Sequence, residues 1–266
     1  MQNDSIKKII MVSVGVCLVC SIFVCSAAVF LKPLQTQNKK LDKIKNILVA
    51  GDLMQEGIDP EKIFNEKIEA AIIEVATGET FPKEKYDDVL NIAKYEIKDI
   101  ADNEKYGMDI PKDEDTPAIG RMPKFMLIYM VKDASGTVEK YILPIYGKGL
   151  WSTMYGFIAM DKDLMTVRGF TFYDHGETPG LGGEVDNQKW KNSWKGKTAI
   201  NENGEVVIHV IKGQVNQEKP EAISQIDGLS GSTLTTRGID NLVKFWLGEN
   251  GYAKFFAKLR KDGSNG

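Results

Sequence analysis

The chain opens with an uninterrupted apolar run at residues 9–31, which contains no charged side chain. Lys7 and Lys8 precede this run, and Lys32 follows it. About 20 apolar residues in a helix are enough to cross a bilayer core of roughly 30 Å. A cleaved signal peptide has a shorter apolar region of about 7–15 residues, although residues 26–28 (Ser-Ala-Ala) could imitate its cleavage site. The pattern therefore predicts an uncleaved transmembrane helix over 9–31.

The following residues, up to 123, show helical patterns separated by polar segments. Residues 35–45 are polar and rich in lysine, and the pattern turns apolar at 47–49, which predicts an amphipathic helix ending near Gly51. Asp59 and Pro60 indicate a helix start, with Asp as the N-cap and Pro at the first helical position. Apolar residues at 63, 68, 71 and 72 continue that second predicted helix. Residues 82–100 are expected to be partly helical and 101–123 to form a loop.

From residue 124 the pattern changes to apolar segments of strand length. We expect strands at 125–131, 138–146, 156–160, 166–173 and 206–212, and a short helix at 187–194. Ile239, Leu242, Val243 and Trp246 then show the spacing of an amphipathic helix. Runs of strands followed by helices predict an α+β fold with a mostly antiparallel sheet and flanking helices.

Composition excludes some classes of function. Hydrophobic residues make up 42% of the 266 residues, charged residues 27%, and the net charge is −3. Binding of nucleic acid needs a basic face, so no nucleic-acid partner is expected. Cys17, Cys20 and Cys25 are the three cysteines, and all lie in the apolar run, where cysteine acts as a small hydrophobe. The rest of the chain can therefore form neither a disulfide nor a cysteine-based metal site, and we predict no metal site.

Residues 227–236 read Asp-Gly-Leu-Ser-Gly-Ser-Thr-Leu-Thr-Thr and lie directly before the last predicted helix. The free N–H groups and the dipole at a helix start stabilise a phosphate, and Gly231 lets the backbone approach a ligand. Composition alone favours an ordinary Ser/Thr helix cap. A serine hydrolase would need a histidine base, and the chain has only His175 and His209. Because His209 lies in a predicted strand, we interpret it as a structural side chain.

A second segment, residues 175–184, reads His-Gly-Glu-Thr-Pro-Gly-Leu-Gly-Gly-Glu and follows a predicted strand. Its four glycines are compatible with a flexible loop. The segment does not match the dinucleotide fingerprint, because Gly-x-Gly-x-x-Gly between a strand and a helix is missing.

Together these segments resemble a family of FMN-binding membrane proteins. Residues 227–233 resemble the motif at which a flavin transferase esterifies the phosphate of FMN to the final threonine, here Thr233. The usual motif has Ala where this chain has Ser232, a small-for-small change. The string Glu-Thr-Pro-Gly-Leu-Gly at 177–182 resembles the C component (NqrC) of the Na⁺-translocating NADH:quinone reductase and the G component of the related Rnf complex. Residues 38–48, 147–156 and 171–177 resemble NqrC in particular, and the resemblance runs to about Leu247.

The resemblance implies covalent FMN, held by a phosphoester to Thr233. It implies that Leu150, Trp151 and Leu181 contact the flavin ring, although ordinary core packing would also explain them. Asp227 would serve the transferase as well as the fold, where it could simply stabilise a turn. No catalytic residue is expected, since the flavin does the chemistry. The expected cofactor-binding residues are Thr233, Asp227, Ser230, Gly231, Ser232, Leu234, Thr235, Leu150, Trp151, Glu177, Thr178, Gly180, Leu181, Gly182 and Gly183.

The resemblance also implies an arrangement across a bacterial inner membrane. Residues 1–8 would be cytoplasmic, 9–31 the transmembrane helix, 32–123 a helical linker part of a periplasmic domain, 124–250 its FMN-binding core, and 251–266 a C-terminal tail. The lysines at the two ends of the span are nearly balanced, so the orientation follows from the resemblance and not from charge counting.

The function implied is electron transfer from NADH toward quinone, coupled to Na⁺ export. The partners would be the A, B, D, E and F components of a six-subunit complex, the lipid bilayer, and a flavin transferase during maturation. No stand-alone activity is expected. Three alternatives stay open at this point: the G component of an Rnf complex, an anchored flavin-binding module that does not relay electrons, and an assembly subunit with unmodified Thr233.

Overall fold

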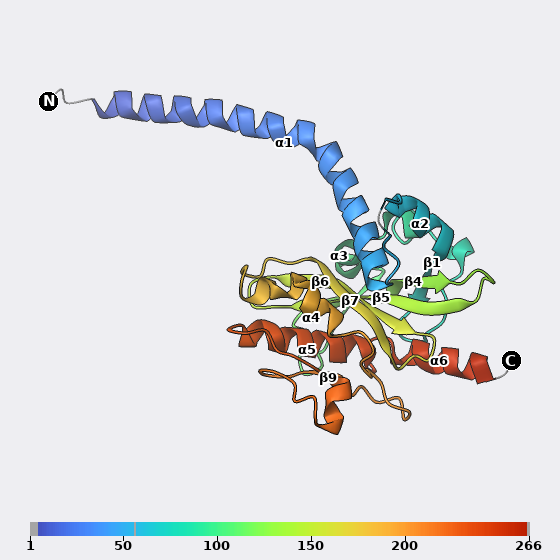
Figure 1. Ribbon diagram of the computed structural model, residues 1–266. Helices are drawn as coiled ribbons and strands as arrows, with labels where there is room; N and C mark the ends of the chain where they lie inside the picture. Colours follow the sequence, from blue (N-terminus) through green and yellow to red (C-terminus); the bar gives the residue numbers. More distant parts are fainter. Residues whose placement is uncertain (1–4, 56, 265–266) are drawn as a thin grey trace. The chain divides into compact units, whose positions relative to one another are not determined.

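The computed structural model describes residues 5–55 and 57–264 (Figure 1). The predicted segments 1–8 and 251–266 therefore lie partly outside the described residues. The helices are α1 (Ile6–Ala50), α2 (Pro60–Lys67), α3 (Ile97–Asp102), α4 (Gln188–Asn192), α5 (Thr233–Leu247) and α6 (Ala253–Ser264), with short 3₁₀ turns η1 (Lys83–Lys85), η2 (Ile92–Lys94), η3 (Gly182–Asp186) and η4 (Pro220–Ser224). The strands are β1 (Ile68–Glu74), β2 (Gly107–Asp109), β3 (Arg121–Pro123), β4 (Phe125–Lys132), β5 (Val138–Lys148), β6 (Thr153–Asp161), β7 (Val167–Asp174), β8 (His209–Val210) and β9 (Gln225–Ile226).

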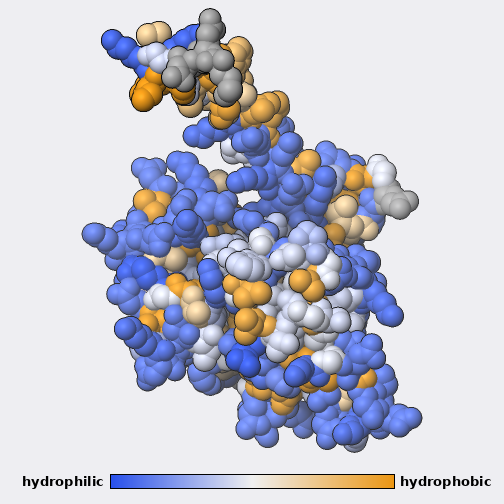
Figure 2. Space-filling view, turned by 90° about the vertical axis from the view of Figure 1, so that its left-hand side faces the viewer, coloured by the Kyte–Doolittle hydropathy of each residue, from blue (hydrophilic) through white to orange (hydrophobic). Residues whose placement is uncertain are grey.

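Helix α1 joins the predicted span and the predicted amphipathic helix into one element. Its large apolar side chains up to Leu34 are exposed, and Figure 2 shows them as orange atoms on this helix. Among residues 5–55 and 57–264, α1 is the one helix long and apolar enough to cross a membrane. The chain divides into two compact units between Lys43 and Ile44, so the last turns of α1 belong to the second unit. The domain boundaries at 123/124 and 250/251 stay predictions.

The second unit is built on a five-stranded sheet in the order β1-β4-β5-β6-β7. Every neighbouring pair in this sheet is antiparallel, and consecutive strands from β4 to β7 lie side by side. In the β5–β6 pair, for example, Leu143 lies opposite Ile158, and both side chains are fully buried. The strands predicted between 125 and 173 are therefore confirmed, as is the α+β class with a mostly antiparallel sheet.

Three local predictions are wrong or too simple. Helix α2 begins at Pro60 as expected but ends at Lys67, and residues 68–74 form β1, which pairs with β4. The β-branched Ile72 and Ile73 favour a strand, and their full burial beside β4 overrides the helical spacing. The predicted loop at 101–123 contains the short pair β2–β3, and the predicted strand at 206–212 shortens to β8.

Helices α5 and α6 run along the sheet (Figure 1). The ring nitrogen of Trp246 in α5 donates to the carbonyl oxygen of Tyr146 at 2.6 Å, and the Tyr252 hydroxyl donates to that of Pro144 at 2.6 Å. Both donors are fully buried, so they are satisfied by β5 backbone where water is excluded. These contacts hold the C-terminal end of α5 and the residues after it against the sheet.

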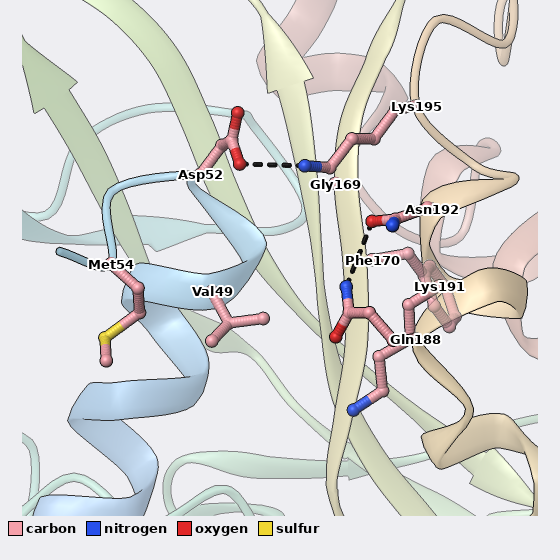
Figure 3. Close-up of a pocket in the computed structure, with 9 residues that line it drawn as sticks. All are labelled: Val49, Asp52, Met54, Gly169, Phe170, Gln188, Lys191, Asn192 and Lys195. Atoms are coloured by element: carbon pink, nitrogen blue, oxygen red, sulfur yellow. Dashed lines mark hydrogen bonds and ion pairs between the residues drawn. The ribbon is translucent and has the colours of Figure 1, made fainter. Parts of the chain in front are cut away.

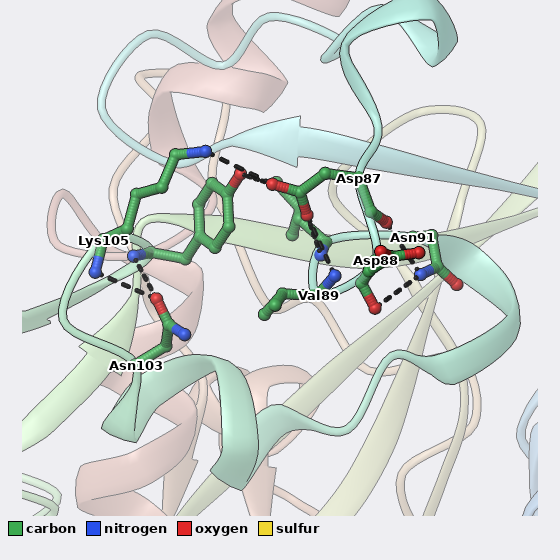
Figure 4. A network of polar contacts seen from close by, with 8 residues as sticks. Asp87, Asp88, Val89, Asn91, Asn103 and Lys105 are labelled. Atoms are coloured by element: carbon green, nitrogen blue, oxygen red, sulfur yellow. Dashed lines mark hydrogen bonds and ion pairs between the residues drawn. The ribbon is translucent and has the colours of Figure 1, made fainter.

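A polar network around Asp87 connects residues 87–91 with residues 103–106, just before β2 (Figure 4). Its carboxylate accepts hydrogen bonds from the Tyr106 hydroxyl, from the backbone N–H of Val89 and Leu90, and from the Lys105 ammonium. The Tyr106 hydroxyl, the closest of these donors, together with the two N–H groups holds the pKa of Asp87 well below its usual range. The network explains how a segment with little regular structure keeps one conformation.

Candidate functional site

Helix α5 begins at Thr233, and its first turn separates three threonines by their surroundings. Thr233 is exposed, whereas Thr235 is 0% exposed and Thr236 is 5% exposed. Residues two apart on a helix lie about 200° apart around its axis, so Thr233 and Thr235 face opposite sides. The hydroxyl of Thr235 donates to Glu177 at 2.6 Å, and that of Thr236 donates to the carbonyl oxygen of Ser232 at 2.9 Å. Thr233 is therefore the one threonine of this turn that is accessible from outside.

Ser232 occupies the N-cap position of α5 without capping it. Its side chain makes no hydrogen bond to a first-turn N–H group, and its hydroxyl donates instead to Thr235 at 2.8 Å. Within residues 5–55 and 57–264, the backbone N–H groups of Thr233, Leu234 and Thr235 have no partner. A helix start with free N–H groups and the positive end of the dipole is suited to bind a phosphate.

The two predicted loops meet at Gly231. This residue has φ +71°, a left-handed conformation that favours glycine, and a Cβ atom here would lie 3.0 Å from Cδ2 of Leu181. The Gly-rich segment that follows β7 therefore touches the loop that precedes α5. The structure thus brings together two segments that are far apart in the sequence.

Glu177 lies beneath this meeting point and is 5% exposed. Its carboxylate accepts hydrogen bonds from Thr235 and from the backbone N–H groups of Leu150, Trp151 and Ser152. Burial raises the pKa of Glu177, but the Thr235 hydroxyl and the three N–H groups together outweigh it and hold the pKa below its usual value of 4.5. The carboxylate is therefore ionised at neutral pH.

The three predicted ring-contact residues, and the predicted cofactor-binding residue Leu234, are exposed apolar side chains. Leu150, Leu181 and Leu234 are exposed, and Trp151 is 67% exposed, which is unusual for a tryptophan. The carbonyl oxygen of Thr178 accepts from the N–H groups of Leu181 and Gly183, which shapes the loop that carries Leu181. The ordinary core-packing alternative is excluded for Leu150, Trp151 and Leu181, because core residues would not be exposed. Gly180 and Thr178 are exposed in the same loop, and Gly182 is buried beside Glu177.

Asp227 closes the loop before α5. Its Oδ1 accepts from the backbone N–H of Val215 at 2.7 Å, and its carbonyl oxygen accepts from the ring nitrogen of Trp190 at 2.9 Å. It thus links its loop to two other segments and is more than a local turn residue. Ser230 is exposed on the same loop.

The two histidines do not form a hydrolase site with the described serines. Nε2 of His175 lies 3.1 Å from Asp186, and its Nδ1 accepts from the backbone N–H of Glu177 at 3.3 Å. His209 in β8 contacts Asp240 and Lys244. Among residues 5–55 and 57–264, neither ring is hydrogen-bonded to a serine, so the Ser-His-Asp alternative has no support.

Sequence reasoning missed Ser152 and the structural role of Thr236. The Ser152 hydroxyl accepts from the backbone N–H of Gly176 at 2.6 Å, which ties the β5–β6 turn to the segment after β7. Thr236 also accepts from the Leu229 N–H at 3.0 Å. Ser152 lies in residues 147–156, which resemble NqrC, so this segment pointed to the site. Its hydrogen-bond partner Gly176 could not be predicted from that segment.

A cleft of about 200 Å³ lies elsewhere in the second unit, between the end of α1, β7 and α4 (Figure 3). Lys195 bridges it to Asp52 at 2.8 Å, and Gln188 donates to Asn192. None of the predicted cofactor-binding residues lines this cleft. The predicted cofactor-binding residues therefore lie outside this cleft.

A family model described as "FMN-binding domain" matches residues 149–248, which include all the predicted cofactor-binding residues. The fold and the site therefore define a membrane-anchored FMN-binding domain. Among curated proteins, the C component of the Na(+)-translocating NADH-quinone reductase from Pseudomonas aeruginosa is 41% identical over 263 residues, covering 98% of each chain. The protein of the same name from Yersinia pestis is also 41% identical over 263 residues, covering 98% of this chain and 95% of the relative.

The solved structures agree with this result. The crystal structure of Shewanella oneidensis NqrC superimposes with a TM-score of 0.74 at 30% identity, covering 84% of this chain and 99% of that chain. The corresponding protein from Parabacteroides distasonis superimposes with a TM-score of 0.61 at 25% identity, covering 86% of this chain and 96% of that chain. The chain belongs to the NqrC family of the Na⁺-translocating NADH-quinone reductase, and the Rnf alternative gives way to it.

Proposed function

We propose that Thr233 carries FMN through a phosphoester and that the protein relays electrons from NADH toward quinone within the Na⁺-translocating complex. The observation that carries the acceptor assignment is the contrast within one helical turn. Thr235 and Thr236 are buried and use their hydroxyl groups inside the domain, whereas Thr233 is exposed. A transferase can therefore reach Thr233 in the folded protein but not the other two.

The attachment step conserves atoms and charge when the donor is a flavin phosphoanhydride. The Thr233 hydroxyl gives its proton to a base of the transferase and forms an O–P bond with the flavin phosphate. The anhydride bond breaks, and the second phosphate leaves with its electron pair. No oxidant or reductant takes part. Asp227 supports this step by holding the loop before Thr233 in place through Val215.

The residues around Thr233 fit the phosphate of such an ester. The free N–H groups of the first turn of α5 can donate to its oxygens, and Ser230 is exposed in the loop before this helix. A diester carries one negative charge, so the uncapped helix start can balance it without a cluster of basic side chains. Gly231 removes the side chain that would otherwise press against Leu181.

The flavin supplies reversible electron transfer, which the side chains of this domain do not provide. Leu150, Trp151 and Leu181 offer exposed apolar side chains for the ring, and Leu181 lies against Gly231 in the loop before Thr233. Thr178, Gly180, Gly182 and Gly183 shape the loop that presents Leu181.

The rest of the proposal follows from membership in the family. The domain would lie in the periplasm, anchored by α1 in the bacterial inner membrane with the N-terminus in the cytoplasm. Residues 9–31 contain no charged side chain and so offer no acid for a sodium route, which is expected on the partner components A, B, D, E and F. The sites for NADH and quinone would also lie on partners.

In-gel flavin fluorescence tests the covalent bond. The full chain, produced together with its flavin transferase, should show a fluorescent band after denaturation, and the Thr233→Ala variant should not. A wild-type chain without the band contradicts the ester, and a band that persists in Thr233→Ala contradicts the acceptor. In membranes, a Thr233→Ala complex that still reduces quinone at the full NADH-driven rate would refute the relay and leave an anchored flavin-binding module.

A further inference from the structure

The carboxylate of Glu177 joins two separate parts of the candidate site. Its Oε1 accepts from the N–H groups of Trp151 at 2.9 Å and Ser152 at 3.3 Å, in the turn between β5 and β6. Its Oε2 accepts from the N–H of Leu150 at 3.2 Å and from the hydroxyl of Thr235 in α5 at 2.6 Å. One buried side chain therefore binds the turn that carries the ring-contact residues and the helix that carries Thr233.

Two glycines leave room for this carboxylate on both sides. A Cβ atom at Gly149 would lie 2.5 Å from Oε1 of Glu177, and one at Gly182 would lie 2.8 Å from Oε2. Real Cβ atoms do not approach an oxygen this closely, so either substitution would displace the carboxylate. Contacts within the protein thus explain both glycines without a flavin ring: Glu177 and Met154 leave no room at Gly149, and Glu177 and Thr235 leave none at Gly182.

All four groups around the Glu177 carboxylate donate hydrogen bonds, so the side chain at this position must act as an acceptor only. Three backbone N–H groups and one hydroxyl point at its two oxygens, and the three N–H groups cannot reverse their polarity. A glutamine amide would place its own N–H₂ group against at least one of these donors. Only the ionised glutamate satisfies all four bonds together.

We propose that Glu177 is a positioning residue, which holds the ring-contact turn at 150–152 in a fixed place relative to the α5 start that bears Thr233. The inference rests on the proposed function, since it takes Thr233 as the flavin attachment point. Glu177 was predicted as a cofactor-binding residue, and its carboxylate accepts four hydrogen bonds from the protein. It acts on the flavin through Leu150, Trp151 and Thr235, and it sets how firmly the ring is docked.

The test compares Glu177→Gln with the matched control Glu184→Gln, which makes the same chemical change in the same loop without touching this network. Both are made in the full chain together with the flavin transferase. Covalent loading, read by in-gel fluorescence, is measured in both variants so that quenching is compared per bound flavin. Iodide quenching of the flavin fluorescence in the folded protein should rise about tenfold in Glu177→Gln, because bonds to a charged group are lost, and stay unchanged in Glu184→Gln. The flavin midpoint potential should shift in Glu177→Gln only.

A second pair of variants covers the case that Glu177→Gln does not fold. Thr235→Val keeps the buried shape but removes the hydroxyl that donates to Glu177, whereas Thr235→Ser keeps the hydroxyl. We expect raised quenching in the valine variant and wild-type quenching in the serine variant. Wild-type quenching and potential in both Glu177→Gln and Thr235→Val would overturn the positioning role. A wild-type chain without covalent flavin would overturn the proposed function instead, so the two failures are distinguishable.

Discussion

Helices α2 and α5 begin in opposite ways. Asp59 caps α2 by accepting from the N–H of Glu61 at 3.0 Å, and Glu61 adds a negative charge to the first turn. The first turn of α5 has neither a side-chain cap nor an acidic residue. In return, α5 buries nine residues against the rest of the domain, whereas α2 buries only Ile63. A short helix on the surface is stabilised at its end, and a helix held by packing along its length can leave its N–H groups free for a ligand.

The largest effect should come from removing the packing that holds α5. Trp246→Ala deletes a fully buried side chain and its hydrogen bond to Tyr146, so the free energy of unfolding should fall by about 3–5 kcal/mol. Denaturant unfolding of the full chain in detergent measures this. The control Ile223→Ala removes an exposed side chain and should change stability by less than about 0.5 kcal/mol. A loss for Trp246→Ala as small as that of the control would mean that packing does not hold α5.

The next effect should come from closing the open helix start. Leu234→Asp places a carboxylate beside the free N–H groups of α5, as Glu61 does in α2. The added charge should compete with the flavin phosphate and slow covalent loading by about tenfold, equivalent to roughly 1.4 kcal/mol. The time course of in-gel fluorescence measures the rate, with Leu234→Asn as the neutral control of similar shape. Equal rates for the two variants would show that the helix start does not bind the phosphate.

Removing the cap of α2 should have a smaller effect. Asp59→Ala should destabilise the domain by about 1 kcal/mol, because the N–H of Glu61 loses its acceptor. Thermal unfolding measures the loss, and Asp59→Asn, which keeps an acceptor oxygen, should retain most of the stability. Flavin loading should remain at the wild-type level in both variants. A change in flavin loading would mean that the cap of α2 influences the start of α5, contrary to this prediction.

The smallest effect concerns the loop that faces the start of α5. The hydrogen bond to Asp186 raises the pKa of His175 above its usual value of 6.5. A raised pKa means that this stabilisation is fully present below pH 6.5 and is lost as the pH rises through the folded-state value. We expect less than about 1 kcal/mol. The test measures the difference in unfolding free energy between wild type and His175→Gln from mildly acidic to mildly basic pH. A difference that does not shrink with rising pH would contradict this stabilisation by His175.

The fold could be predicted where a local pattern decided the structure. The strands from 125 to 173 alternate with clear turns, and Ile239, Leu242, Val243 and Trp246 mark the buried side of α5. The pattern failed at residues 68–74, because Ile72 fits both a helix and a strand, and pairing with β4 decides between them. That pairing joins residues far apart in the chain, which no window of sequence contains.

The candidate site was predicted at the level of its segments and not of its contacts. The motif at 227–233 singled out Thr233, but its exposure and the burial of Thr235 depend on how α5 packs. The role of Glu177 could not be read from the chain, because its partner Thr235 lies 58 residues away. The resemblance located the site, and the hydrogen bonds between distant segments show how it is held.

The exposure of Thr233 also separates two events in time. In the proposed function, the domain can complete its core and form the network around Glu177 while Thr233, the proposed acceptor, is still accessible from outside. A modifying enzyme then meets a finished surface, and the unmodified protein can wait as a folded intermediate. Under the proposed attachment to Thr233, synthesis of the polypeptide and supply of FMN would not have to be synchronised in the cell.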